Sequence, residues 1–143
     1  MLEMRTVWRI LIAGALLGQG CAPQPGEELL APTVAQTRLR SFQSRTFDVG
    51  DRQLAMRGVI AALQDLGFSV ERADEPLGLV TAARFAEPNF YDVVAVTVTV
   101  RPVTGDRILI RVTVIYNNKP IEDPKIYQNF FATVERSLFV SRN

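Results

Sequence analysis

The feature that most restricts the fold is a pair of alternating segments, residues 91–101 and 107–116, separated by a short turn sequence. Within each segment every second residue is strongly apolar, and this period of two is typical of a β-strand with one buried face. The intervening Thr104-Gly105-Asp106 has the composition of a turn. We therefore predict a long antiparallel hairpin with a mixed odd-numbered face. Its buried face would contain the even-numbered residues Val94, Val96, Val98, Val100, Ile108, Ile110, Val112, Val114 and Tyr116.

Two other segments have apolar residues at helical spacing. The first, residues 52–66, follows two aspartates, Asp48 and Asp51, either of which can accept from free amides at a helix start. Gly67 can end this helix in a left-handed conformation. The second helix would begin at Asp123-Pro124, an N-cap followed by a proline at the first helical position. The apolar positions are Met56, Val59, Ile60, Leu63 and Leu66 in the first helix, and Tyr127, Phe130, Phe131, Val134 and Leu138 in the second.

Three shorter segments predict further strands: residues 38–47, with a start near Ser41, residues 68–73 and residues 79–85. The resulting order is strand, helix, four strands, helix. We therefore predict an α+β domain over residues 38–143, with two layers. Its antiparallel sheet would have about five strands, and both helices would lie on one face of that sheet.

The N-terminal segment has the features of an export signal. Arg5 and Arg9 provide a positive region, and residues 10–17 provide an apolar one. These eight apolar residues form only about 12 Å of helix, whereas a spanning helix needs about 20 residues. We therefore predict a cleaved signal over residues 1–20, in preference to a buried N-terminal helix. Residues 21–37 contain three prolines without a sustained period, which predicts a flexible tether.

Residues 18–21, Gly-Gln-Gly-Cys, resemble the lipobox of bacterial lipoproteins, in which small residues precede a cysteine. The glutamine and the first glycine depart from the small residue and leucine usual at those two positions. The resemblance implies that Cys21 is lipidated and becomes the mature N-terminus. It also implies an outer-membrane location facing the periplasm, because Ala22 rather than aspartate follows. A lone cysteine in an exported protein has no disulfide partner, and thioether formation would protect its thiol. Three acyl chains would anchor the protein essentially permanently.

The charge balance restricts the partners. Loss of residues 1–20 removes two arginines and Glu3, so that the 16 basic and 15 acidic residues become 14 of each. A nucleic-acid-binding domain would normally be basic, and we expect no such partner. Arg38, Arg40 and Arg45 form a local basic cluster. The cluster could contact anionic headgroups or be a solvated strand edge that discourages unwanted pairing, and we favour the second interpretation.

Parts of the predicted domain resemble a group of Gram-negative lipoproteins of unknown function, and together they span most of residues 38–139. The order of elements is also similar to the helix-grip domains of BamC, an accessory lipoprotein of the outer-membrane protein assembly machine. These resemblances imply a helix-grip-like fold and carry no catalytic residues. The segments concerned are residues 63–70, 73–74, 77–82, 123–131 and 137–139.

The residues that usually carry catalysis are scarce. The chain has no histidine, the commonest general base and metal ligand, and lipidation would remove the thiol of Cys21. Lys119 and Lys125 lie in no catalytic motif. The neighbouring acids Asp74 and Glu75 fit turn chemistry better than acid–base catalysis, and the acids at 48 and 51 lack the further oxygens that calcium needs. We therefore expect no enzyme activity, no cofactor and no bound metal.

Two classes of function remain. The first is a non-catalytic accessory or interaction module of a cell-envelope complex. The second is a binding module for a lipid or other apolar ligand between the last helix and the sheet. A deep apolar cavity there would favour the second, and a filled core beside an exposed apolar patch would favour the first. Ile126, Phe130 and Phe139 fall outside the main stripe of the last helix. Since a helix that is apolar around its circumference is deeply buried or shared with a partner, we predict an interaction surface at these three residues.

Overall fold

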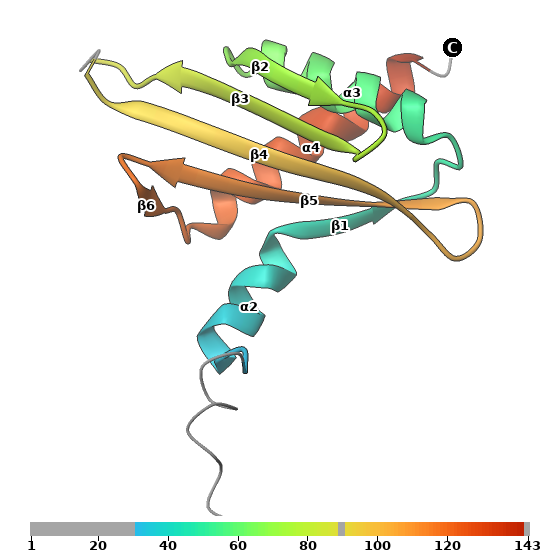
Figure 1. Ribbon diagram of the computed structural model, residues 1–143, viewed down its shortest axis with the longest axis horizontal. Helices are drawn as coiled ribbons and strands as arrows, with labels where there is room; N and C mark the ends of the chain where they lie inside the picture. The colour runs from blue at the N-terminus through green and yellow to red at the C-terminus, as the bar shows by residue number, and fades with distance from the viewer. Residues whose placement is uncertain (1–30, 89–90, 142–143) are drawn as a thin grey trace, which may run out of the picture. The chain divides into compact units, whose positions relative to one another are not determined.

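The computed structural model describes residues 31–88 and 91–141, and the part from Thr33 onward forms one compact unit. Within these residues the fold is α+β, as predicted, with three helices and an antiparallel sheet of six strands (Figure 1). The elements are α2 (Val34–Phe42), β1 (Ser44–Phe47), α3 (Arg52–Asp65), β2 (Ser69–Asp74), β3 (Leu79–Phe85), β4 (Val93–Val103), β5 (Arg107–Tyr116), β6 (Lys119–Pro120) and α4 (Pro124–Ser141).

The sheet has the strand order β1-β5-β4-β3-β2, and every neighbouring pair is antiparallel. The two-residue strand β6 also pairs with β5, beyond the stretch that pairs with β1. Helices α3 and α4 lie on one face of the sheet, behind it in the view of Figure 1. The opposite face is not covered by any helix or strand of the described residues.

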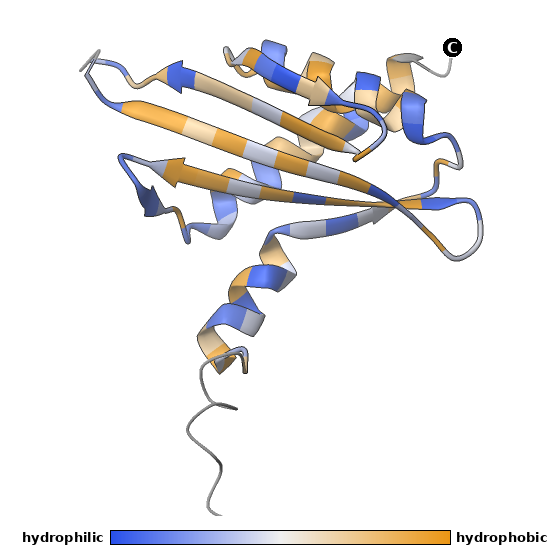
Figure 2. Cartoon of the chain, viewed as in Figure 1, coloured by the Kyte–Doolittle hydropathy of each residue, from blue (hydrophilic) through white to orange (hydrophobic). Residues whose placement is uncertain are grey.

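The β4–β5 hairpin confirms the alternation predicted from the sequence. Its register pairs Val98 with Val112 and Thr97 with Thr113. The even-numbered valines and isoleucines from Val94 to Val114 are buried against the helices, while the odd-numbered residues are half-buried or exposed. The same alternation is visible as orange and pale bands along β4 and β5 in Figure 2. Tyr116, at the end of β5, extends beyond the helices and is partly exposed.

Helices α3 and α4 begin as the sequence predicts, and α3 ends just before the predicted Gly67. Asp51 accepts a hydrogen bond from the amide of Gln53 at 2.8 Å, and Asp123 accepts one from the amide of Lys125 at 2.9 Å. Gly67 follows α3 with φ +79°, a conformation that residues with a side chain rarely adopt. The two helices touch closely at Gly58, where an added Cβ would lie 2.6 Å from a methyl carbon of Leu138.

The structure corrects the predictions for residues 34–43. Helix α2 covers residues 34–42, so the last part of the predicted tether is helical. The predicted first strand was too long, because β1 begins only at Ser44. Thr33 and Gln36 form a capping box in which each side chain bonds the other residue's amide, at 3.1 and 3.2 Å. The Thr-x-x-Gln sequence is the signal for this helix.

A cluster of buried polar groups lies along the edge of β5, between the stretch that pairs with β1 and the stretch that pairs with β6. The carbonyl of Gln43 accepts from the amide of Val112 at 2.8 Å, and the carbonyl of Val114 accepts from the amide of Ile121 at 2.9 Å. The hydroxyl of Tyr127 donates to the carbonyl of Ile121 and accepts from the side-chain amide of Gln43 at 3.4 Å. Tyr127 therefore connects α4 to both segments that line this edge.

The burial pattern predicts opposite responses at adjacent positions of β4. Val98→Asp places a charge without a partner in the core, which costs several kcal/mol, and we expect it to abolish cooperative thermal unfolding. Thr97→Asp lies on the exposed face and should change the free energy of unfolding by less than about 1 kcal/mol. Circular dichroism melting curves of both variants test this, and similar midpoints would contradict the register.

Tyr127→Phe removes only the hydroxyl of the buried cluster. It leaves the side-chain amide of Gln43 and the carbonyl of Ile121 without this partner, and we expect a loss of about 1–3 kcal/mol in the free energy of unfolding. Tyr91→Phe is the matched control, because that ring is 93% exposed. Urea unfolding should separate the two variants, and equal stability would show that the Tyr127 hydroxyl contributes nothing.

Candidate interaction site

The layer between α4 and the sheet is filled. The side chains that would line a ligand cavity there, Tyr127, Phe131, Val98 and Val112, are each at most 2% accessible. A cavity large enough for a water molecule would expose surface on its lining residues. These four residues therefore do not line such a cavity, and they pack against one another as a core.

Phe130 is the correction in this region, because it is only 4% exposed and its ring meets Phe131 edge-on, with centroids 5.3 Å apart. Helical spacing places Phe130 on the same flank of α4 as Thr133 and Ser137, which are buried where α4 passes α3. The prediction that Phe130 borders a surface was wrong because α3 and α4, which were predicted on the same face, also contact each other. Contact with α3 buries a flank of α4 that would be exposed if α4 packed on the sheet alone.

Ile126 and Phe139 are exposed, to 39% and 69%, but they do not form one surface. They lie at opposite ends of α4, separated by about 20 Å of helix. Phe139 borders a small hollow of about 240 Å³ that also includes Phe47, Asp48 and Glu135. The structure therefore does not bring the three predicted interaction residues together.

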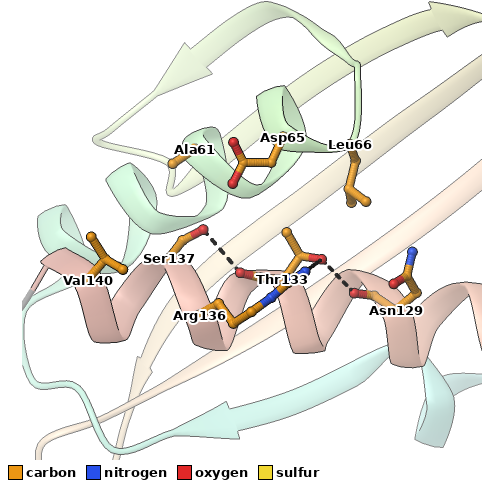
Figure 3. A pocket seen from close by; sticks show the side chains of 8 residues that line it. All are labelled: Ala61, Asp65, Leu66, Asn129, Thr133, Arg136, Ser137 and Val140. Carbon is orange, nitrogen blue, oxygen red and sulfur yellow. Dashed lines mark hydrogen bonds between the residues drawn. The ribbon is translucent and has the colours of Figure 1, made fainter.

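A groove of about 560 Å³ runs between α3 and α4 on the side away from the sheet (Figure 3). Three polar side chains of α4 in this groove bond within their own helix. Thr133 donates to the carbonyl of Asn129 at 2.9 Å, Ser137 donates to the carbonyl of Thr133 at 3.0 Å, and Arg136 donates to the Thr133 hydroxyl at 3.1 Å. These bonds hold the hydroxyl groups against the helix backbone, and the arrangement contains no nucleophile paired with a base.

A second polar cluster lies where β4 begins and β5 ends. Asp92 accepts from the Tyr116 hydroxyl at 2.5 Å and from the Asn117 side-chain amide at 2.6 Å. The hydrogen bond from Tyr116, followed by that from Asn117, holds the pKa of Asp92 below its usual value. The same bond to Asp92 raises the pKa of Tyr116. Because Asn117 also accepts from the amide of Val93 at 3.0 Å, the cluster ties the start of β4 to the end of β5.

Arg45 and Asp74, two other charged residues noted in the sequence, make local contacts. The guanidinium group of Arg45 lies 5.0 Å from the centre of the Phe131 ring and 4.0 Å from a carboxylate oxygen of Glu135. Asp74 pairs with Arg72 at 2.8 Å and accepts from the amide of Leu77 at 3.0 Å, which is the turn chemistry predicted for it. The hydrogen bond from Arg72 and then that from Leu77 lower the pKa of Asp74.

Among the described residues, one face of the sheet is uncovered, and we call the odd-numbered residues of β3, β4 and β5 its open face. None of these residues is buried. The centre carries small side chains such as Ala95, Thr97 and Thr113, and one end carries the exposed Phe85 beside Val93. The odd-numbered positions of the alternating segments are the sequence signal for this surface, whereas the predicted interaction residues Ile126, Phe130 and Phe139 lie on α4.

Comparisons with known proteins provide no assignment for this site. No protein-family model matches the chain, and no curated protein matches it either. The resemblances to Gram-negative lipoproteins and to BamC therefore stay predictions. Cys21 and the signal segment lie outside the described residues. Within residues 31–88 and 91–141, no helix has the length and apolar character to cross a membrane. No group of three potential metal ligands occurs in that same part of the chain.

The burial of Phe130 changes the expected result of its truncation. We expect Phe130→Ala and Phe131→Ala each to cost about 3–5 kcal/mol in the free energy of unfolding, because both rings leave cavities. Phe139→Ala is the exposed control on the same helix and should cost less than about 1 kcal/mol. Chemical denaturation measures all three. A Phe130→Ala protein as stable as Phe139→Ala would restore the surface interpretation of this residue.

Proposed function

We propose that this protein is a lipid-anchored lipoprotein of the outer membrane that faces the periplasm and acts as a non-catalytic interaction module of a cell-envelope complex. The anchor would be acyl chains on Cys21, and the predicted tether would connect them to the domain. The domain itself would bind a protein partner through the open face of its sheet.

The observation that carries the proposal is the contrast between the two faces of one sheet. The face under α3 and α4 is packed with side chains that are almost completely inaccessible. The other face is broad and uncovered among the described residues (Figures 1 and 2). Antiparallel sheets commonly leave one face to water, so this face stays accessible to a partner.

The filled core argues against the alternative, in which a lipid or other apolar molecule lies between α4 and the sheet. A ligand pocket typically has a volume of about 300–1,000 Å³. Tyr127, Phe131 and Val98 occupy the place that such a ligand would need. Binding there would require α4 to separate from the sheet, which would expose the buried polar contacts of Tyr127 with Gln43 and Ile121.

Site-specific photocrosslinking in intact cells tests the proposal. A photoreactive amino acid at Thr97 probes the open face, and one at the exposed Gln128 of α4 is the matched control. We expect a discrete protein adduct from position 97 and little from position 128. The protein itself should fractionate with the outer membrane, whereas Cys21→Ser should yield an uncut precursor or a soluble product.

Each part of the proposal can fail separately. If Cys21→Ser fractionates with the outer membrane like the unchanged protein, the lipid anchor is wrong. If position 97 gives no adduct, or position 128 gives the same adduct with equal yield, the open face is not the interaction surface.

A further inference from the structure

Three arginines lie together on the open face at the turn end of the β4–β5 hairpin. Arg101 of β4 pairs directly with Leu109 of β5, so Arg107 and Arg111 are its two diagonal neighbours. Diagonal neighbours of this kind are about 7–8 Å apart. All three arginine side chains are exposed. We call these residues the arginine triad.

None of the three guanidinium groups has a carboxylate of the described residues within 4.0 Å. Arg107 donates through Nε to the carbonyl of Thr104 at 3.1 Å, and Arg111 donates through Nε to the hydroxyl of Ser44 at 3.1 Å. Both partners are neutral. Asp106, which is adjacent to Arg107 in sequence, has its side chain beside Gly50.

These two hydrogen bonds do not offset the three positive charges of the triad. Like charges directly opposite each other destabilise a sheet, and diagonal neighbours are still within reach of long side chains, so the three guanidinium groups repel one another. Arg45 and Arg72 show the opposite arrangement, because each of them lies near a carboxylate. A negatively charged partner above the triad would remove the repulsion and supply the missing counter-charges.

We propose that the arginine triad is the docking site for an acidic segment of the protein partner. This inference rests on the proposed function and specifies the chemistry of that partner. Guanidinium groups bind carboxylates through paired hydrogen bonds. In an extended segment, residues at alternate positions are separated by about 7 Å, so carboxylates at every second position match the spacing of the triad.

The surroundings of the triad favour a protein segment over a lipid surface. Peripheral membrane sites combine basic residues with large apolar side chains that enter the interface. Next to the triad on the open face lie Thr99, the half-buried Leu109 and the partly exposed Val103. The strongly exposed aromatic residues, Phe85 and Tyr91, lie at the opposite end of β4.

The test uses a fluorescent synthetic peptide of alternating glutamate and serine, and the chain from residue 21 onward with Cys21→Ser. Fluorescence anisotropy measures binding at low salt. We expect Arg101→Gln, Arg107→Gln and Arg111→Gln together to weaken binding about tenfold or more, because charge-assisted hydrogen bonds are lost. The control replaces Arg38, Arg40 and Arg57 by glutamine, which removes the same charge from exposed positions elsewhere, and its affinity should stay within about twofold.

Thermal melting of the triad variant should show a midpoint equal to or above that of the parent protein, since a repulsion has been removed. If the triple variant melts lower, Arg101→Gln alone replaces it in the binding assay. Absence of peptide binding by the parent protein overturns the proposal, and so does equal weakening in the triad and control variants. Triad-dependent binding to phosphatidylcholine–phosphatidylglycerol vesicles without peptide binding would assign the site to a membrane and overturn it as well.

Failure of this inference can be distinguished from failure of the proposed function. If the position-97 photocrosslink persists unchanged in the triad variant, the open face still binds a partner but the triad does not. If no position on the open face gives an adduct, the proposed function itself has failed.

Discussion

The structure depends on the burial of one face of the β4–β5 hairpin. Eight valine and isoleucine side chains along two adjacent strands provide this face, from Val94 to Val114, and α3 and α4 cover it. Full burial of a side chain of this size contributes about 1.5–3 kcal/mol. The same contact determines the register, because a shift of one residue would move the threonines into the core and the valines into water. The positions of both helices follow from this apolar surface.

The second constraint is that α4 makes contacts with the rest of the domain on several of its sides. Its main stripe packs on the sheet, its flank at Phe130 is buried beside α3, and Tyr127 bonds to the segments that border β5. On the far side, the guanidinium group of Arg45 lies over the Phe131 ring. These contacts give α4 no free apolar side along its middle. Helix α4, which the sequence pattern favoured as the element that binds a partner, is therefore mainly a structural element.

The closed core also determines where function can lie. With the helix face of the sheet filled, the surfaces that the described residues leave for a partner include the groove between α3 and α4, the helix ends and the open face. The hydroxyl groups in the groove are bonded to α4 itself. The open face instead carries, at one end, three arginines that have no carboxylate of the described residues within 4.0 Å, and exposed apolar side chains at the other end. This asymmetry suits a partner with an acidic segment and could orient it along the strands.

The sequence by itself determined the α+β class, the hairpin and its buried face, and the starts of α3 and α4, because alternation and capping are local in the chain. It did not identify α2, although the Thr33–Gln36 capping box is present, because Arg38 to Phe47 also alternates weakly. The fate of Phe130 and the assembly of the arginine triad were decided only by the tertiary structure. Phe130 lies on the flank of α4 whose residues Thr133 and Ser137 are beside α3, which is distant in sequence, and the triad exists only because the register of β4 and β5 places Arg101 between Arg107 and Arg111. Local patterns show which face of an element is apolar, whereas pairing across the sheet decides which side chains become neighbours.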